Sequence, residues 1–153
     1  MSKVLVDVEV LPNYINGRFV QAENVTSVVN PANGEKIVEV PLSTESDVDL
    51  AVRAAHEAQK EWALVPAPQR AEVLYTIGQL LKDRKEEIAT LLTLENGKVL
   101  EEARGEVQEG IDMAFYMAGE GRRMFGQTTH AELPNKFAMS VRAPIGVVGI
   151  ITP

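Results

Sequence analysis

The side chains that most often carry enzymatic chemistry are sparse in this sequence. It holds no cysteine and only two histidines, His56 and His130. Without a cysteine, disulfides, thiolate metal sites and a cysteine nucleophile are excluded within these residues. Two isolated histidines, with no third imidazole and no acidic partners at helical spacing, give a metal site little to build on. We therefore predict that both histidines are solvated or capping residues.

Adjacent carboxylates occur at Glu86-Glu87 and at Glu101-Glu102. Paired carboxylates can act as general acid and general base, but both pairs fall in predicted helices rich in lysine and arginine, which favours solvated faces with ion pairs. Glu109 and Asp112 share one helix face at a spacing of three, so they could ligate a cation or serve as acid and base. Surface charge is the stronger interpretation for all of these residues.

The serine and glycine patterns also argue against two common kinds of site. Ser140 lies within a predicted strand and has no G-x-S-x-G elbow, so Ser140 and His130 do not form a nucleophilic pair. Gly119-Glu-Gly121 falls inside a predicted helix, and Gly146-Val-Val-Gly149 falls inside a predicted strand. Neither is the strand-to-helix glycine loop that binds phosphate groups.

The last ten residues, Pro144-Ile-Gly-Val-Val-Gly-Ile-Ile-Thr-Pro153, indicate a buried strand. A run of Val and Ile without polar alternation is typical of a strand covered on both faces of a parallel sheet. Ligands of open α/β sheets bind beyond the carboxyl ends of the strands, which is where Thr152 and Pro153 fall. We expect this segment to line a cofactor cleft, and we expect the chain to be the front portion of a larger enzyme because such a strand needs neighbours.

The elements before this segment change from β to helical and back. Residues 1–11 alternate as in a strand or terminal arm, Asn16-Gly17 predicts a hairpin over 13–20, and Ala32-Asn33-Gly34 predicts a second one over 27–41. The apolar period then becomes 3.6, which predicts helices over 44–62, from Pro66 to about residue 85, from there to Asn96-Gly97, and from about 99 to 125. An alternating strand follows at 136–142.

Composition limits the classes of partner. The chain has 153 residues, 45% apolar and 24% charged, with a net charge of −7. That charge repels nucleic acids and anionic membranes, and no apolar run approaches the roughly 20 residues of a membrane span. The first residues also lack the pattern of a secretory signal. We therefore predict a cytoplasmic protein that binds neither nucleic acid nor membrane.

Four segments, in order and in spacing, resemble the N-terminal third of the NAD(P)-dependent aldehyde dehydrogenase superfamily. They are Asn-Tyr-Ile-Asn-Gly-Arg-Phe-Val (13–20), Val-Asn-Pro-Ala-Asn-Gly (29–34), Leu-Glu-Asn-Gly-Lys (94–98) and Ala-Pro-Ile-Gly-Val-Val-Gly-Ile-Ile-Thr-Pro (143–153). The resemblance implies an α/β fold with a cofactor-binding domain on an open sheet, a catalytic domain and a bridging β oligomerisation domain. On this basis the chain divides into an N-terminal arm (1–12), the N-terminal part of the cofactor-binding domain (13–135), a strand of the oligomerisation domain (136–143) and the first buried strand of the continuing cofactor-binding core (144–153).

The resemblance also implies an activity. The full-length enzyme would oxidise an aldehyde to a carboxylate through a cysteine thiohemiacetal and hydride transfer to NAD or NADP, and similarity over 119–139 hints at a semialdehyde. Ile151, Thr152 and Pro153 match family positions that line the cofactor cleft. Val28, Val29 and Glu106 approximately match residues with which some members hold a monovalent cation.

The resemblance further implies that the family's catalytic cysteine and general-base glutamate lie downstream of Pro153, so we expect these 153 residues alone to be inactive. We expect a homo-oligomer, or association through unpaired strands. The alternative is a non-catalytic helical module that acts by interaction or oligomerisation.

Overall fold

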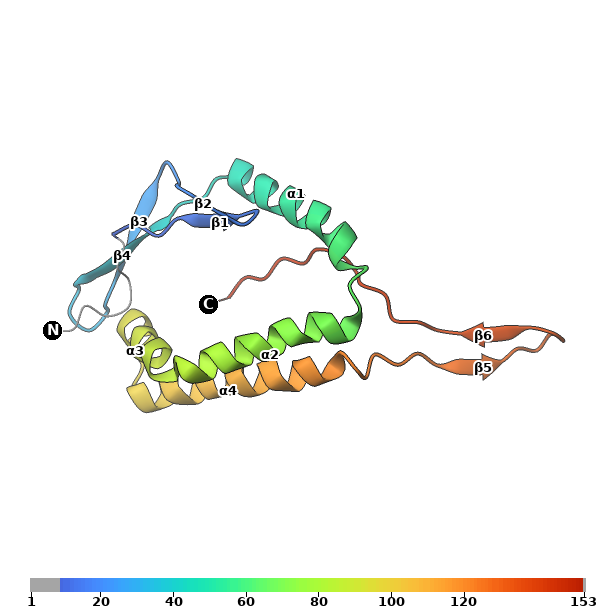
Figure 1. Ribbon diagram of the computed structural model, residues 1–153. Helices are drawn as coiled ribbons and strands as arrows, with labels where there is room; N and C mark the ends of the chain where they lie inside the picture. Colours follow the sequence, from blue (N-terminus) through green and yellow to red (C-terminus); the bar gives the residue numbers. More distant parts are fainter. Residues whose placement is uncertain (1–8, 153) are drawn as a thin grey trace.

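The computed structural model describes residues 9–152 as a mixed α/β structure (Figure 1). Two short hairpins and a long helix form one layer, and a second layer consists of two helices packed side by side with a shorter helix at one of their ends (Figure 1). A third hairpin extends beyond the ends of these helices. The elements are β1 (Asn13–Ile15), β2 (Arg18–Val20), β3 (Val25–Val29), β4 (Lys36–Pro41), α1 (Glu45–Trp62), α2 (Ala67–Asp83), α3 (Lys85–Asn96), α4 (Leu100–Glu120), β5 (Thr128–His130) and β6 (Phe137–Met139).

The first hairpin is confirmed where the sequence predicts it. Strands β1 and β2 pair antiparallel, and the two turn residues Asn16 and Gly17 both have positive φ, at 51° and 74°. This is the type I′ geometry that Asn-Gly favours. Tyr14 and Phe19 face each other across the hairpin, with ring centroids 5.2 Å apart.

The second hairpin, β3 with β4, is also confirmed and gains a neighbour. Its turn is stabilised by Asn30, whose side-chain Oδ1 accepts from the Ala32 N–H at 2.9 Å, and by Gly34 at φ 73°. The backbone on either side of Val10 pairs parallel with β4 through Glu39. The described part of the predicted arm is therefore strand-like, and residues 1–8 of that prediction lie outside the described residues.

Helix α1 begins at a capping box and buries none of its residues. The Thr44 hydroxyl accepts from the Asp47 backbone N–H at 3.3 Å, and the Asp47 carboxylate accepts from the Thr44 N–H at 2.7 Å. These hydrogen bonds hold the pKa of Asp47 below its ordinary value. The predicted apolar stripe of α1 is present, but its side chains are exposed. The N-terminal cap therefore contributes more to the local order of α1 than burial does.

The helix boundaries between α2, α3 and α4 follow proline and glycine. Helix α2 starts directly after Pro66, and α3 ends at Gly97, which takes the left-handed conformation at φ 86°. The Pro31 ring packs so closely on Gly97 that a Cβ there would lie 2.8 Å from the proline Cγ. The turn of the second hairpin is therefore held against the turn that precedes α4.

The core lies between α3 and α4. Ala89 from α3 and Ala103, Val107 and Ile111 from α4 are buried together, and Phe115 packs against them from the next turn. Small side chains at this contact let the two helix backbones approach closely. The spacing of the buried α4 residues is the 3.6-residue stripe that the sequence predicts.

Helices α2 and α4 pack through glycine. Phe115 of α4 lies over Gly78 of α2 and meets Tyr75 edge to face, with ring centroids 5.3 Å apart. At the other end, Gly121 lies against Ala71 and the carbonyl oxygen of Ala67. The predicted helix to residue 125 is wrong in its end: α4 stops at Glu120, because the glycines at 119 and 121 weaken its last turn and Gly121 serves as the C-cap.

A third hairpin appears where the sequence analysis expected one strand. The predicted strand at 136–142 is present as β6, but its partner β5 was predicted only as an exit from the helix. Its residues Thr128, Thr129 and His130 are all exposed and polar, so no apolar alternation marked them. At the base of this hairpin, the Ser140 N–H donates to the Gln127 carbonyl at 2.8 Å.

The buried strand predicted at 144–153 is not formed among the described residues up to 152, and its place in a continuing cofactor-binding core stays a prediction. This segment is extended, belongs to no strand and is exposed throughout. The physical reason is that a strand is defined by its hydrogen-bonded neighbours, and none of the described residues pairs with it. The Val and Ile run shows what the segment can bury, and nothing in the described chain covers it.

We expect the close contact at Gly121 to be essential for stability. Gly121→Ala would place a methyl group on Ala71 and 2.8 Å from the Ala67 carbonyl oxygen, so it should destabilise the chain by about 1–3 kcal/mol. Gly110→Ala is the matched control, since nothing lies within 4 Å of a Cβ there, and it should stabilise α4 by up to about 1 kcal/mol. Urea unfolding followed by circular dichroism measures both, and equal effects of the two variants would contradict the packing.

Candidate functional site

The predicted cofactor residues lie at the end of the extended segment. Ile151 is fully exposed, at 100% of its reference area, and Thr152 is exposed beside it. Pro153 lies outside the described residues. The two described residues offer an apolar side chain, a hydroxyl and backbone carbonyls to a ligand, which are groups that can contact a nucleotide. Their role in cofactor binding stays a prediction.

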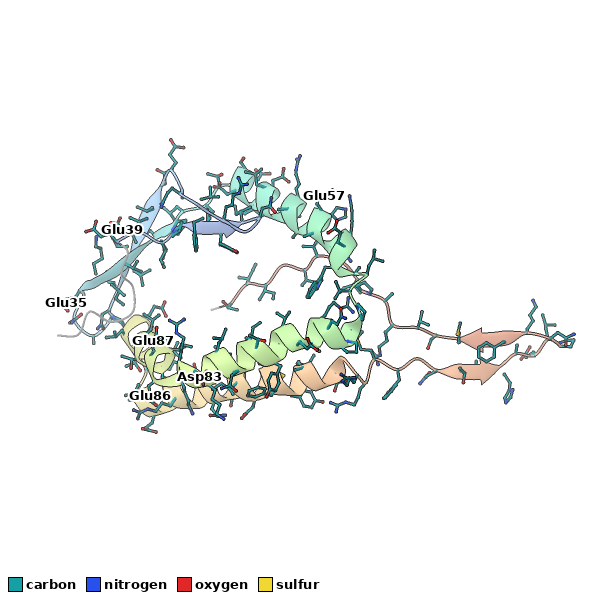
Figure 2. All side chains as sticks on the ribbon, viewed as in Figure 1. Glu35, Glu39, Glu57, Asp83, Glu86 and Glu87 are labelled. Carbon is teal, nitrogen blue, oxygen red and sulfur yellow. The ribbon has the colours of Figure 1, made fainter. Side chains whose placement is uncertain are left out.

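The carboxylate pairs on α3 and α4 are tied into ion pairs through arginine. Arg104 of α4 donates from Nη2 to the Glu86 carboxylate of α3 at 2.8 Å and also pairs with Glu101. Glu87 accepts from Arg84 Nε at 2.8 Å. In Figure 2 the labelled Glu86 and Glu87 lie at the end of the helical layer where α3 begins. The prediction of solvated charged faces is confirmed.

These ion pairs lower the pKa of the two glutamates of α3. Hydrogen bonds from Arg104 hold the pKa of Glu86 below its ordinary value, and Arg84 does the same to the pKa of Glu87. A carboxyl with a lowered pKa is ionised at neutral pH and is a poor general acid. Arg104 and Glu86 are 18 residues apart in the sequence, so helical spacing does not predict their ion pair. Helical spacing does predict the pair of Arg104 with Glu101, which is three residues away.

Two further acids of α4, Glu106 and Asp112, also have partners. Glu106 pairs with Lys98, and Asp112 accepts from Gln108 Nε2 at 2.9 Å. Gln108 in turn accepts from Lys85 Nζ at 2.8 Å. Across residues 9–152, no three His, Cys, Asp or Glu side chains are grouped so as to hold a metal ion. Glu109 and Asp112 therefore belong to no such group among these residues.

Val28, Val29 and Glu106 approximately match the residues with which some family members hold a monovalent cation. The structure brings the hairpin that carries the two valines near the start of α4, but it pairs Glu106 with a lysine. Val28 and Val29 flank an irregularity in the register of β3 with β4. The contact of Pro31 with Gly97 brings this hairpin to the turn before α4, near Lys98. Lys98 supplies the positive charge at Glu106, so a cation bound to that carboxylate would have to compete with an ammonium group.

The histidines are exposed as predicted, whereas Ser140 lies just after β6 and not within the strand. His56 is exposed on α1 and His130 is exposed in β5. The Ser140 hydroxyl oxygen accepts from the Gln127 N–H at 3.1 Å, which is a structural role at the base of the hairpin. The rejection of a serine nucleophile agrees with this contact.

Two hollows flank the packed pair α2 and α4. One, of about 340 Å³, is walled by Tyr75 and Phe115, and the other, of about 360 Å³, by Trp62, Met117 and Met124. Both are open and mostly apolar. Each also has one acidic and one basic side chain in its wall, Glu72 with Arg122 in the first and Glu120 with Arg70 in the second. Among residues 9–152, no helix has the length and apolarity to cross a membrane.

Comparison with known proteins identifies the family. The model of the aldehyde dehydrogenase family matches residues 19–153. This covers most of the chain, and the chain therefore belongs to the aldehyde dehydrogenase family, as the four sequence segments indicated.

Curated relatives share this assignment. The chain is 46% identical over 149 residues to malonate-semialdehyde dehydrogenase of Bacillus pumilus strain SAFR-032, covering 96% of the chain and 31% of the relative. It is 42% identical over 151 residues to malonate-semialdehyde dehydrogenase of Bacillus subtilis strain 168, covering 97% of the chain and 31% of the relative. The chain thus spans about a third of the length of the curated relatives that it matches.

Solved structures agree with the fold. Lactaldehyde dehydrogenase from Escherichia coli superimposes with a TM-score of 0.78 at 36% identity, over 83% of this chain and 27% of that one. An NADP-dependent enzyme from Escherichia coli gives 0.82 at 32% identity, over 85% and 27%. Betaine aldehyde dehydrogenase from Staphylococcus aureus, in complex with NAD⁺, gives 0.83 at 28% identity, over 87% and 28%. The family's cofactor is accordingly NAD or NADP.

The Arg104–Glu86 link predicts a measurable titration. Arg104→Gln should raise the pKa of Glu86 toward its ordinary value of 4.5, because the charged hydrogen bonds to its carboxylate are lost. In the parent chain, the contribution of this pair to stability is present above pH 4.5 and is lost as the pH falls through the lowered pKa. NMR titration of the side-chain carboxyl carbons reports both. Arg123→Gln is the control: it breaks only the ion pair with Glu120, so the pKa of Glu86 should stay unchanged.

Proposed function

We propose that this chain supplies one portion of an NAD(P)-dependent aldehyde dehydrogenase that oxidises an aldehyde to a carboxylate. The observation that carries the proposal is the family match over residues 19–153, supported by relatives at 42–46% identity and by superposition on two aldehyde dehydrogenases and an NADP-dependent enzyme. Since the chain spans about a third of those relatives, the activity belongs to the protein as a whole.

We propose a semialdehyde as the substrate class. Both relatives described above are malonate-semialdehyde dehydrogenases, and the similarity over 119–139 hinted at the same class. Structures at lower identity act on other aldehydes, such as lactaldehyde. A semialdehyde carries a carboxylate, so the complete pocket should offer it a cationic or hydrogen-bonding partner.

Within this proposal, the chain's own contribution is to cofactor binding. When bound, NAD or NADP would accept the hydride removed from the aldehyde. Ile151, Thr152 and Pro153 would line its cleft, and the exposure of Ile151 and Thr152 leaves their side chains and carbonyls free for this contact. The cysteine that the family reaction needs would come from outside these residues, since the sequence contains no cysteine. The resemblance implies the same for the general-base glutamate.

A homo-oligomer and a cytoplasmic location remain predictions of the sequence. The β5–β6 hairpin supports the first, because it projects beyond the helices and its residues are almost all exposed (Figure 1). Residues 136–143 would then supply a strand to an oligomerisation sheet, as the resemblance implies. Pairing of this hairpin with another subunit would cover Phe137 and Met139.

The activity is tested with the protein made from its complete gene and, in parallel, with residues 1–153. We expect the complete gene product to reduce NAD or NADP in the presence of malonate semialdehyde, faster than with lactaldehyde or betaine aldehyde. The 153-residue chain should show no aldehyde-dependent reduction, because it has no thiol to form the covalent intermediate. Absorbance of the reduced nicotinamide measures both.

Either of two results would contradict the proposal. A folded complete gene product that reduces neither cofactor with any of the three aldehydes would favour the non-catalytic interaction module. Aldehyde-dependent turnover by the 153-residue chain alone would show that the chemistry does not need a cysteine from elsewhere. Preference for lactaldehyde or betaine aldehyde would overturn the semialdehyde class and leave the family reaction in place.

A further inference from the structure

Asparagine is followed directly by glycine at Asn16-Gly17, Asn33-Gly34 and Asn96-Gly97. In such a pair the backbone nitrogen of the glycine can attack Cγ, the side-chain carbonyl carbon of the asparagine. Glycine favours this attack because it has no side chain to obstruct the nitrogen. A nitrogen that donates a hydrogen bond must first lose that bond, so the local structure of each pair decides how readily it reacts.

Both reacting groups of Asn33-Gly34 are held in place. The Gly34 N–H donates to the Asn30 carbonyl oxygen at 2.7 Å. The Asn33 side chain is fixed by Glu35: its Oδ1 accepts from the Glu35 N–H at 3.0 Å, and its Nδ2 donates to the Glu35 carboxylate at 2.9 Å. The nitrogen and the carbonyl carbon of this pair are therefore both restrained from approaching each other.

The Asn96-Gly97 pair is restrained by the end of α3. Asn96 is the last residue of that helix, and the Gly97 N–H donates to the Thr93 carbonyl oxygen at 2.9 Å. The Pro31 ring also lies so close that a Cβ on Gly97 would be 2.8 Å from it. Closing a ring at this pair would require both the helix end and the proline contact to open.

Asn16-Gly17 has neither restraint. The ladder of the first hairpin ends at the pair Ile15 and Arg18, so the turn residues lie outside it. Among residues 9–152, no hydrogen bond engages the Gly17 N–H or the Asn16 side chain. The nearest atom to a Cβ on Gly17 would be the Tyr14 hydroxyl oxygen, 4.0 Å away. A two-stranded hairpin is also marginally stable by itself, so its turn opens more readily than a helix end.

We infer that Asn16 is a site of spontaneous deamidation in this protein. The Gly17 nitrogen gives its proton to water or hydroxide and forms a bond with the Asn16 Cγ, the bond from Cγ to the side-chain nitrogen breaks, and ammonia leaves. The remaining cyclic imide is then opened by one water molecule at either of its carbonyl carbons. The products are aspartate and isoaspartate, and no electrons are transferred. This inference goes beyond the proposed function and does not depend on it.

The two products affect the first hairpin differently. Aspartate at position 16 keeps the turn, because Asp-Gly suits the same type I′ geometry as Asn-Gly. Isoaspartate adds a carbon to the backbone of the turn, so the pairing of Tyr14 with Phe19 should be lost. Either product makes the net charge of −7 more negative by one.

Peptide mapping of the complete gene product tests the site. The folded protein is incubated at neutral and at mildly alkaline pH, digested, and analysed by mass spectrometry and by enzymatic methylation of isoaspartate. The peptide with Asn16 should be modified about tenfold faster than those with Asn33 and Asn96, the factor expected for opening one hydrogen bond before reaction. The reaction should be faster at alkaline pH, because the nitrogen must lose its proton. Asn16→Gln should abolish it.

Two comparisons test the structural cause. Glu35→Ala should speed the modification of Asn33 and leave Asn16 unchanged, whereas Glu23→Ala, which alters an exposed glutamate outside the three pairs, should change neither. In urea-unfolded protein the three rates should converge. Modification of Asn33 or Asn96 as fast as Asn16 in the folded protein would overturn the inference, and so would the same ratio of rates in the folded and unfolded protein.

Discussion

The close approach of α2 and α4 through small residues is the constraint on which the rest of the structure depends. Gly78 accepts the Phe115 ring, and Gly121 fits against Ala71, so the two helix axes are fixed at both ends of their contact. Helix α3 then closes the small core through Ala89. The third hairpin leaves this pair just after Gly121, and its course is set by how α4 ends. Larger side chains at Gly78 or Gly121 would push the two helices apart, which would also displace the third hairpin that follows α4.

Because the helices meet through small residues, the buried side chains of the described residues are also small. The buried core consists of alanine, valine and isoleucine, and most of the larger apolar side chains remain partly exposed. A core of this size offsets only part of the entropy lost on ordering 153 residues. Helix α1 illustrates the result, since its order comes from the Thr44–Asp47 cap and from β1 contacts while its apolar stripe faces outward.

Features encoded over short distances were predictable from sequence. The Asn16-Gly17 turn, the Thr44 cap and the stop at Gly97 each depend on residues within one turn of chain, and all three are observed. The strand β5 was missed because Thr128, Thr129 and His130 show no apolar alternation, and its pairing with β6 is set by the base contact with Ser140. The 144–152 segment is the opposite case. Its residues are typical of a buried strand, but strand formation depends on partners that the local sequence does not contain.

The candidate site follows the same division. Helical spacing was enough to predict that the paired glutamates, Glu86-Glu87 and Glu101-Glu102, lie on charged faces. The ion pair between Arg104 and Glu86 could not be predicted in this way, because it depends on the packing of α3 against α4. The family could be recognised because its motifs are turns and strand ends, where specific residues are required by backbone geometry. The substrate could not be recognised in the same way. Specificity depends on polar groups that converge on a ligand, and the hollows beside α2 and α4 are walled mainly by apolar side chains. Under our proposal, the groups that choose an aldehyde would come from other parts of the protein, while these residues would contribute to the cofactor cleft.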